Sequence, residues 1–142
     1  MTNDTTNTKT HTGSCHCGDI RFEVELDASK GTHCNCTICT KTAVLGAIVQ
    51  PSAFRLLSST DKSNFYEWGG KVAKRYFCKT CGIHVYGSGF LEQLGGDFVS
   101  INMHCIDDLD PAQVKVGYWD GRHDNWMAGM RDTPWPIAQN GS

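Results

Sequence analysis

Three cysteines lie within six positions of the sequence, in the stretch THCNCTICTK at residues 32–41. Cys34, Cys36 and Cys39 are close enough along the chain to bind one metal ion, but tetrahedral zinc takes four ligands. Three protein ligands, with a fourth position left for water or an incoming thiol, are the arrangement of a catalytic zinc site. The cluster therefore predicts a functional zinc site.

The chemistry of such a site follows from its charge. Zinc bound by three thiolates carries a net charge of about −1 and is a weaker Lewis acid than zinc bound by three histidines. It is better suited to holding a thiolate than to making hydroxide. Any one of three further residues could instead be the fourth ligand and close the site as a structural one: His33, His104 or Cys105. Of these, Cys105 is of a type that is more often a small buried hydrophobe than a ligand.

Four other cysteines form two short motifs in which a glycine follows the second cysteine. These are Cys15-His16-Cys17-Gly18 and Cys78-Lys79-Thr80-Cys81-Gly82. A zinc knuckle turns sharply at this glycine, which takes a positive φ so that backbone N–H groups point at the sulfurs. Two paired knuckles predict a closed, structural zinc site of four cysteines. A redox role for Cys78 and Cys81 is the alternative, but such a pair normally opens a helix of a βαβ unit.

The composition is that of a globular domain. The chain has 142 residues, of which 39% are hydrophobic and 20% charged, and its formal net charge is −2. This charge gives no argument for a nucleic-acid or membrane partner. The longest apolar run, AVLGAIV at residues 43–49, is too short to span a bilayer. With no secretory signal, we expect a cytoplasmic protein whose clustered thiols stay reduced and bind metal.

Short strands dominate the expected secondary structure. The segment DIRFEVEL alternates between apolar and polar residues, as a half-buried strand does. The pattern predicts short helical segments only near residues 107–114, where Asp110 precedes Pro111, and near 125–132. We expect a flexible tail at residues 1–12 and one mainly β domain at 13–138. The eight expected strands cover residues 19–26, 43–50, 54–59, 65–68, 72–77, 83–87, 97–105 and 113–119.

Taken together, the segments GSCHCGDIRFEVE, HCNCTICTK and KRYFCKTCGIHVY resemble the three cysteine motifs of a known family. It is the glutathione-dependent formaldehyde-activating enzyme family, which also includes centromere protein V. The resemblance covers residues 13–119 and implies a β-tent fold that binds two zinc ions. It implies a structural zinc at Cys15, Cys17, Cys78 and Cys81, and a functional zinc at Cys34, Cys36 and Cys39. Members of the family are described as carbon–sulfur lyases that interconvert S-hydroxymethylglutathione with glutathione and formaldehyde.

We therefore expect an enzyme that acts on an adduct between glutathione, or another thiol, and an aldehyde. Glutathione carries two carboxylates, and the cations near the cysteine motifs are candidate partners for them: Lys41, Lys74 and Arg75. The alternative for these cations is a solvated strand face. The alternative for the whole chain is a zinc-stabilised module that binds a protein partner, with both zinc ions structural.

Overall fold

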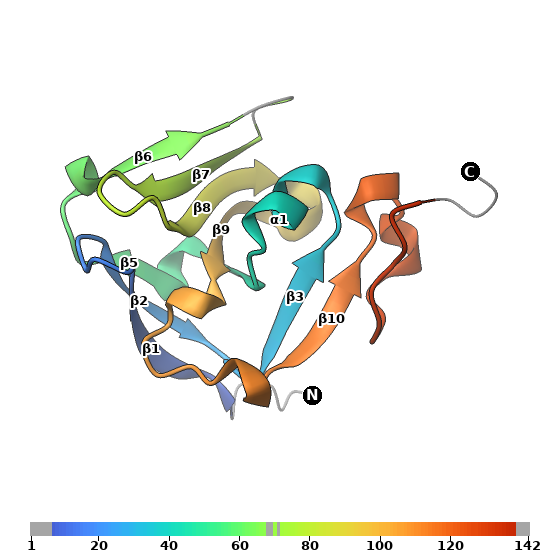
Figure 1. Cartoon of the computed structure of the whole chain (residues 1–142), viewed down its shortest axis with the longest axis horizontal. Helices are drawn as coiled ribbons and strands as arrows, with labels where there is room; N and C mark the ends of the chain where they lie inside the picture. The colour runs from blue at the N-terminus through green and yellow to red at the C-terminus, as the bar shows by residue number, and fades with distance from the viewer. Residues whose placement is uncertain (1–6, 68–69, 71, 139–142) are drawn as a thin grey trace.

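The computed structural model describes residues 7–67, 70 and 72–138. Two β-sheets make up most of it, and their strands run in the order β1-β2-β5 and β10-β3-β4-β9-β8-β7-β6 (Figure 1). The strands are β1 (Lys9–Ser14), β2 (Arg21–Leu26), β3 (Lys30–Cys34), β4 (Gly46–Val49), β5 (Phe54–Leu56), β6 (Ser63–Tyr66), β7 (Ala73–Cys78), β8 (His84–Leu91), β9 (Gly96–Asn102) and β10 (Lys115–Trp119). The mainly β fold predicted from the sequence is therefore confirmed.

Helices are short. The α-helix α1 spans Thr37–Thr42, and Cys36 is its N-cap. Within the described residues, no helix is long enough to cross a membrane. The 3-10 helices are η2 (Pro51–Ala53), η3 (Thr60–Lys62), η4 (Glu92–Leu94), η5 (Met103–Cys105), η6 (Pro111–Gln113), η7 (Gly121–His123) and η8 (Trp126–Ala128).

The alternating pattern of β2 produces the core that joins the two sheets. Phe22 and Val24 are fully buried, whereas the glutamates between and after them stay half-buried or exposed. These two side chains belong to one cluster with Val85 of β8 and Ile101 of β9. The apolar face of the small sheet thus packs on the large sheet, and burial of this face is a main contribution to folding.

The expected tail at residues 1–12 is corrected by β1. Residues 9–12 are part of this strand, which pairs with β2 in an antiparallel register from Lys9 opposite Leu26 to Ser14 opposite Arg21. Thr10 and Thr12 are β-branched and suit a strand, and pairing satisfies the backbone groups that a tail would leave to water. Residues 1–6 lie outside the described part of the chain.

The eight predicted strands correspond to β2 and to β4 through β10, with shorter bounds in several cases. Trp68, at the end of the predicted strand 65–68, lies outside the described residues. The two expected helical segments are present as η6 and η8, and the Asp110 side chain caps η6 by accepting a hydrogen bond from the Ala112 N–H. Among the longer elements of the described residues, β1, β3 and α1 were not predicted.

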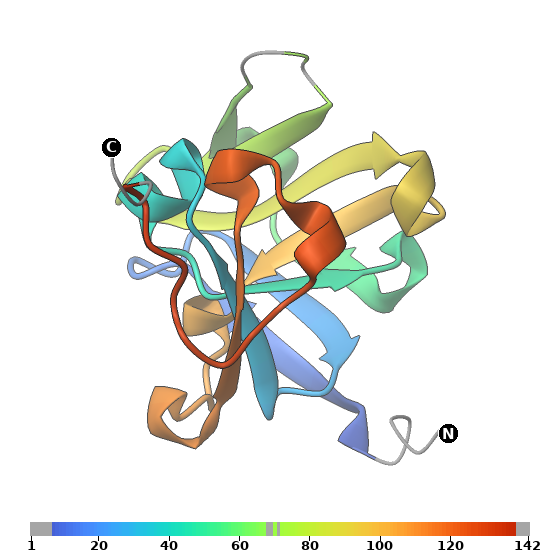
Figure 2. The same cartoon turned by 90° about the vertical axis from the view of Figure 1, so that its right-hand side faces the viewer.

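The β3 strand lies between two strands that run in opposite directions to each other. It pairs with β4 in an antiparallel manner and with β10 in a parallel manner, so that Trp119 lies opposite Cys34. Figure 2 shows the C-terminal segment after β10 lying beside β3 and α1. The parallel pairing therefore brings residues near 120 to the three-cysteine motif.

Candidate metal centres

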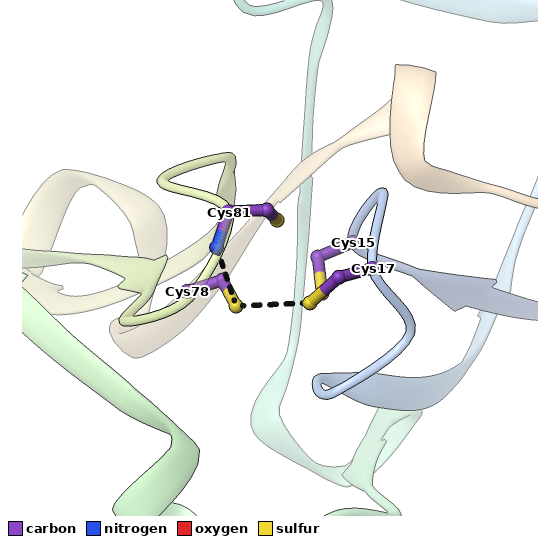
Figure 3. Close-up of side chains that lie close together, drawn as sticks. All are labelled: Cys15, Cys17, Cys78 and Cys81. Carbon is purple, nitrogen blue, oxygen red and sulfur yellow. Dashed lines mark hydrogen bonds between the residues drawn. The ribbon is translucent and has the colours of Figure 1, made fainter.

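The two knuckles meet in space and form a cluster of four cysteines (Figure 3). Their sulfur atoms all lie within 4.8 Å of one another. The Cys17 sulfur is 3.7 Å from that of Cys15 and 3.6 Å from that of Cys78. Tetrahedral zinc with Zn–S bonds of about 2.3 Å has S–S edges of about 3.8 Å. The spacing of the sulfurs thus fits one tetrahedral ion with four thiolate ligands.

Backbone N–H groups point at these sulfurs, as the knuckle motifs predict. Gly18 and Gly82 have φ values of 86° and 78°, which confirms the predicted turn at each glycine. The Cys78 sulfur accepts hydrogen bonds from the N–H groups of Thr80 at 3.3 Å and Cys81 at 3.4 Å. Burial opposes ionisation of Cys78, but these N–H groups lower the net pKa of its thiol. The turn is therefore built for thiolates, which are the form that binds a metal.

The remaining three-cysteine motif forms a second cluster at the junction of β3 and α1. Cys34 ends β3, Cys36 is the N-cap of α1, and Cys39 lies in the first turn of that helix. Their three sulfurs also lie within 4.8 Å of one another, and all three residues are half-buried. Helical hydrogen bonds from Thr40 N–H to Cys36 O and from Ala43 N–H to Cys39 O, both 2.9 Å long, fix this turn. We call these three residues the cysteine trio.

Protons are unequally shared in the trio. Hydrogen bonds from the thiols of Cys34 and Cys39 lower the pKa of Cys36 well below its ordinary value. The hydrogen bond with Cys36 raises the pKa of Cys34, and hydrogen bonds with Cys34 and Cys36 raise the pKa of Cys39, because a second thiolate beside the first would be repelled. Three thiolates can coexist at this spacing only with a cation between them. The donor set therefore fits a thiophilic dication such as zinc.

None of the three candidates for a fourth ligand joins the trio. Among the described residues, no other histidine, cysteine or carboxylate belongs to the trio's cluster. The His33 ring donates through Nδ1 to the Val44 carbonyl oxygen at 3.0 Å, and His104 is exposed. Cys105 is 7% exposed, belongs to the core and has its pKa raised to about 12 by burial, as expected of a buried hydrophobe.

The three cations proposed to bind substrate lie in different environments. Lys41 is exposed in the last turn of α1. Lys74 and Arg75 are neighbours in β7, so their side chains leave opposite faces of the sheet. The Lys74 ammonium lies 4.7 Å from the Phe65 ring centroid. The Arg75 charge reaches the trio, where it adds to the hydrogen bonds within the trio and favours the thiolates of Cys36 and Cys39.

A buried carboxylate beside the trio was not predicted from the sequence. Asp120 is 4% exposed and accepts hydrogen bonds from Asn35, His123 and Asn125. Burial raises the pKa of Asp120, but these hydrogen bonds outweigh burial and lower it below the ordinary value. The sequence signal for this carboxylate is weak, because the segment DGRHDN at residues 120–125 has the composition of a polar turn and Asn35 resembles a spacer between two cysteines.

Comparisons with known proteins agree with the cysteine motifs. The model of the family described as glutathione-dependent formaldehyde-activating enzyme matches residues 10–122. A curated relative from Emericella nidulans, provisionally described as a glutathione-dependent formaldehyde-activating enzyme, is 31% identical over 98 residues, which is 63% of this chain. The chain spans about half the length of that relative, since the match covers 49% of it. A crystal structure of a Rhodobacter sphaeroides protein superposes with a TM-score of 0.63 at 26% identity, covering 71% of this chain and 92% of the other.

Proposed function

The chain belongs to the glutathione-dependent formaldehyde-activating enzyme family, and on this basis we propose that it is a zinc-dependent carbon–sulfur lyase. Its substrate is the adduct of a thiol with formaldehyde, with S-hydroxymethylglutathione as the leading candidate. The four-cysteine cluster holds a structural zinc, and the cysteine trio holds the zinc at which the thiol reacts.

The observation that carries this proposal is the difference between the two clusters. One brings together four sulfurs from two distant knuckles, whereas the other brings together three sulfurs from one short turn. A zinc site that closes with four protein ligands is structural, and one with three leaves a position for an outside ligand. The half-buried position of the trio is consistent with access for a small thiol.

The reaction needs little covalent help from the protein. In the forward direction the thiol sulfur bonds to the formaldehyde carbon, and the thiol proton ends on the former carbonyl oxygen; the reverse reaction breaks the C–S bond. A zinc ion at the trio would lower the pKa of a thiol and so supply the thiolate nucleophile at neutral pH. The chain itself contributes the binding and orientation of the two reactants.

Arg75 is the best-supported partner for a substrate carboxylate. It is half-buried, and its charge acts on two members of the trio. It also acts on His84: burial lowers the pKa of this histidine, and the Arg75 charge lowers it further. A guanidinium there can bind a carboxylate with two parallel hydrogen bonds. Lys41 stays a candidate at the end of α1, while the contact of Lys74 with Phe65 directs it away from this role.

The experiment that tests the function is cobalt substitution followed by addition of glutathione. Cobalt–thiolate charge-transfer bands should grow and shift when an external thiol binds at the trio. The same addition to Cys36→Ala should leave the bands of the four-cysteine site unchanged. Turnover of several thiols with formaldehyde then identifies the preferred substrate. Two fully protein-bound metals with no response to any thiol would instead favour a non-enzymatic binding module.

A further inference from the structure

Asn35 lies between two cysteines of the trio, and one segment of the chain binds all of its polar groups. Its N–H donates to the Trp119 carbonyl at 3.3 Å, and its side-chain NH2 donates to Asp120 Oδ1 at 2.8 Å. In return, Arg122 donates its backbone N–H to Asn35 Oδ1 at 2.8 Å and its Nε–H to the Asn35 carbonyl at 2.9 Å. Residues 119–122 therefore fix both the backbone and the side chain of the residue that links Cys34 to Cys36.

The carboxylate of Asp120 is the buried centre of this arrangement. Its Oδ1 accepts hydrogen bonds from Asn35 and from His123 Nδ1 at 2.7 Å, and its Oδ2 accepts one from Asn125 at 3.2 Å. A buried carboxylate with three donors cannot move without losing charge-assisted bonds. The bond to Asn35 thus ties the trio to a rigid point of the C-terminal segment.

Gly121 brings the same segment against the trio itself. A Cβ atom at this position would clash with the Cys34 sulfur and would lie 2.8 Å from the Trp126 ring. Only a residue without a side chain allows this approach, and the resulting contact limits the orientations that Cys34 can take.

We propose that Asn35 and Asp120 are positioning residues for the metal ion of the trio. The inference rests on the proposed function, because it takes the trio to be a metal site. A short turn with three ligands has many sulfur arrangements when it is free, and only a few of them suit a metal ion. Residues that fix a ligand-bearing loop in one arrangement raise metal affinity, typically by about 10- to 100-fold.

Two alanine variants separate this role from general stabilisation. Asn35→Ala and Asn125→Ala each remove one amide donor to Asp120, but only Asn35→Ala removes the side-chain hydrogen bonds that tie the trio to residues 120 and 122. Each full-length protein is titrated with Co²⁺ against a competing chelator, and the charge-transfer bands of both sites are followed. In Asn35→Ala we expect the affinity of the trio for Co²⁺ to fall by about 10-fold or more and the affinity of the four-cysteine site to stay unchanged. In Asn125→Ala we expect a change of less than about 3-fold at either site.

A second substitution of Asn35 provides the test if Asn35→Ala folds poorly. Asn35→Asp has the same shape but places an acceptor opposite the Asp120 carboxylate. Its added negative charge alone would strengthen binding of a cation. Weaker binding of Co²⁺ at the trio of this variant would therefore support a positioning role for Asn35. The inference would be overturned if the trio of both Asn35 variants bound Co²⁺ with wild-type affinity, or if Asn125→Ala lost as much affinity at the trio as Asn35→Ala. Either result would leave the proposed function intact. A wild-type protein that binds one cobalt ion only would overturn both.

Discussion

The sulfurs of Cys17 and Cys78 lie 3.6 Å apart, although 61 residues separate them in the chain. This contact joins the turn between β1 and β2 to the end of β7, and so connects the two sheets. Cys15 and Cys78 are also part of the hydrophobic core. A metal ion at this point would therefore act as a cross-link between sheets, and its binding free energy would be part of folding.

The first prediction compares one cysteine from each cluster. We expect about two zinc ions per chain in the wild type and about one in Cys36→Ala, which should stay folded. Cys78→Ala should lose the metal of the four-cysteine site and unfold at a much lower temperature, because the cross-link is lost. Metal analysis and thermal unfolding measure both effects. If Cys36→Ala unfolds as readily as Cys78→Ala, the metal of the trio is structural.

The second prediction concerns the glycine that follows the second knuckle. Gly82 has a φ of 78°, and no atom lies within 4 Å of a Cβ built on it. Gly82→Ala should therefore cost only the left-handed backbone strain, about 1–2 kcal/mol of unfolding free energy. Gly82→Asn is the matched control and should cost less, because asparagine tolerates this conformation. Chemical denaturation measures both, and equal losses would show that strain at φ is not the cause.

The third prediction tests Arg75 as the partner of a substrate carboxylate. Arg75→Ala should raise KM for glutathione by about 10-fold or more, because it removes the charge-assisted hydrogen bonds to the carboxylate. Lys74→Ala, on the opposite face of the same strand, is the control and should change KM by less than about 2-fold. A thiol without carboxylates, such as 2-mercaptoethanol, should show little effect of either change. If Arg75→Ala raises KM equally for both thiols, Arg75 acts on the trio and not on the substrate carboxylate.

The partition of the cysteines into two clusters could be read from the sequence because it is encoded locally. Glycine after Cys17 and Cys81 marks the knuckles, and its absence after Cys39 marks the different motif. The strands with clear alternation or apolar runs were also predictable, since period two is a direct consequence of strand geometry.

Other parts of the fold depend on partners that are distant in the chain. The contacts between Asn35 and residues 120 and 122 span 85 and 87 positions and exist only because β10 pairs with β3. The strand β3, KGTHC, has no apolar alternation, and its place in the sheet comes from its two neighbours. The helix α1, TICTKT, contains three threonines that are weak helix formers, and tertiary contacts override this preference.

The last prediction uses two glycines of the C-terminal region. Gly121→Ala would force a methyl group into the Cys34 sulfur and the Trp126 ring, whereas Gly117→Ala would meet mainly the Met130 side chain, with its sulfur at 2.8 Å. Met130 is half exposed and flexible, so it can move aside at little cost. If the trio binds metal as proposed, we therefore expect Gly121→Ala to lose that metal and the proposed lyase activity while the four-cysteine site keeps its metal, and Gly117→Ala to keep both metals. Metal analysis and turnover of the glutathione–formaldehyde adduct measure this difference. Two bound metals and full turnover in Gly121→Ala would contradict a close contact between residue 121 and the Cys34 sulfur.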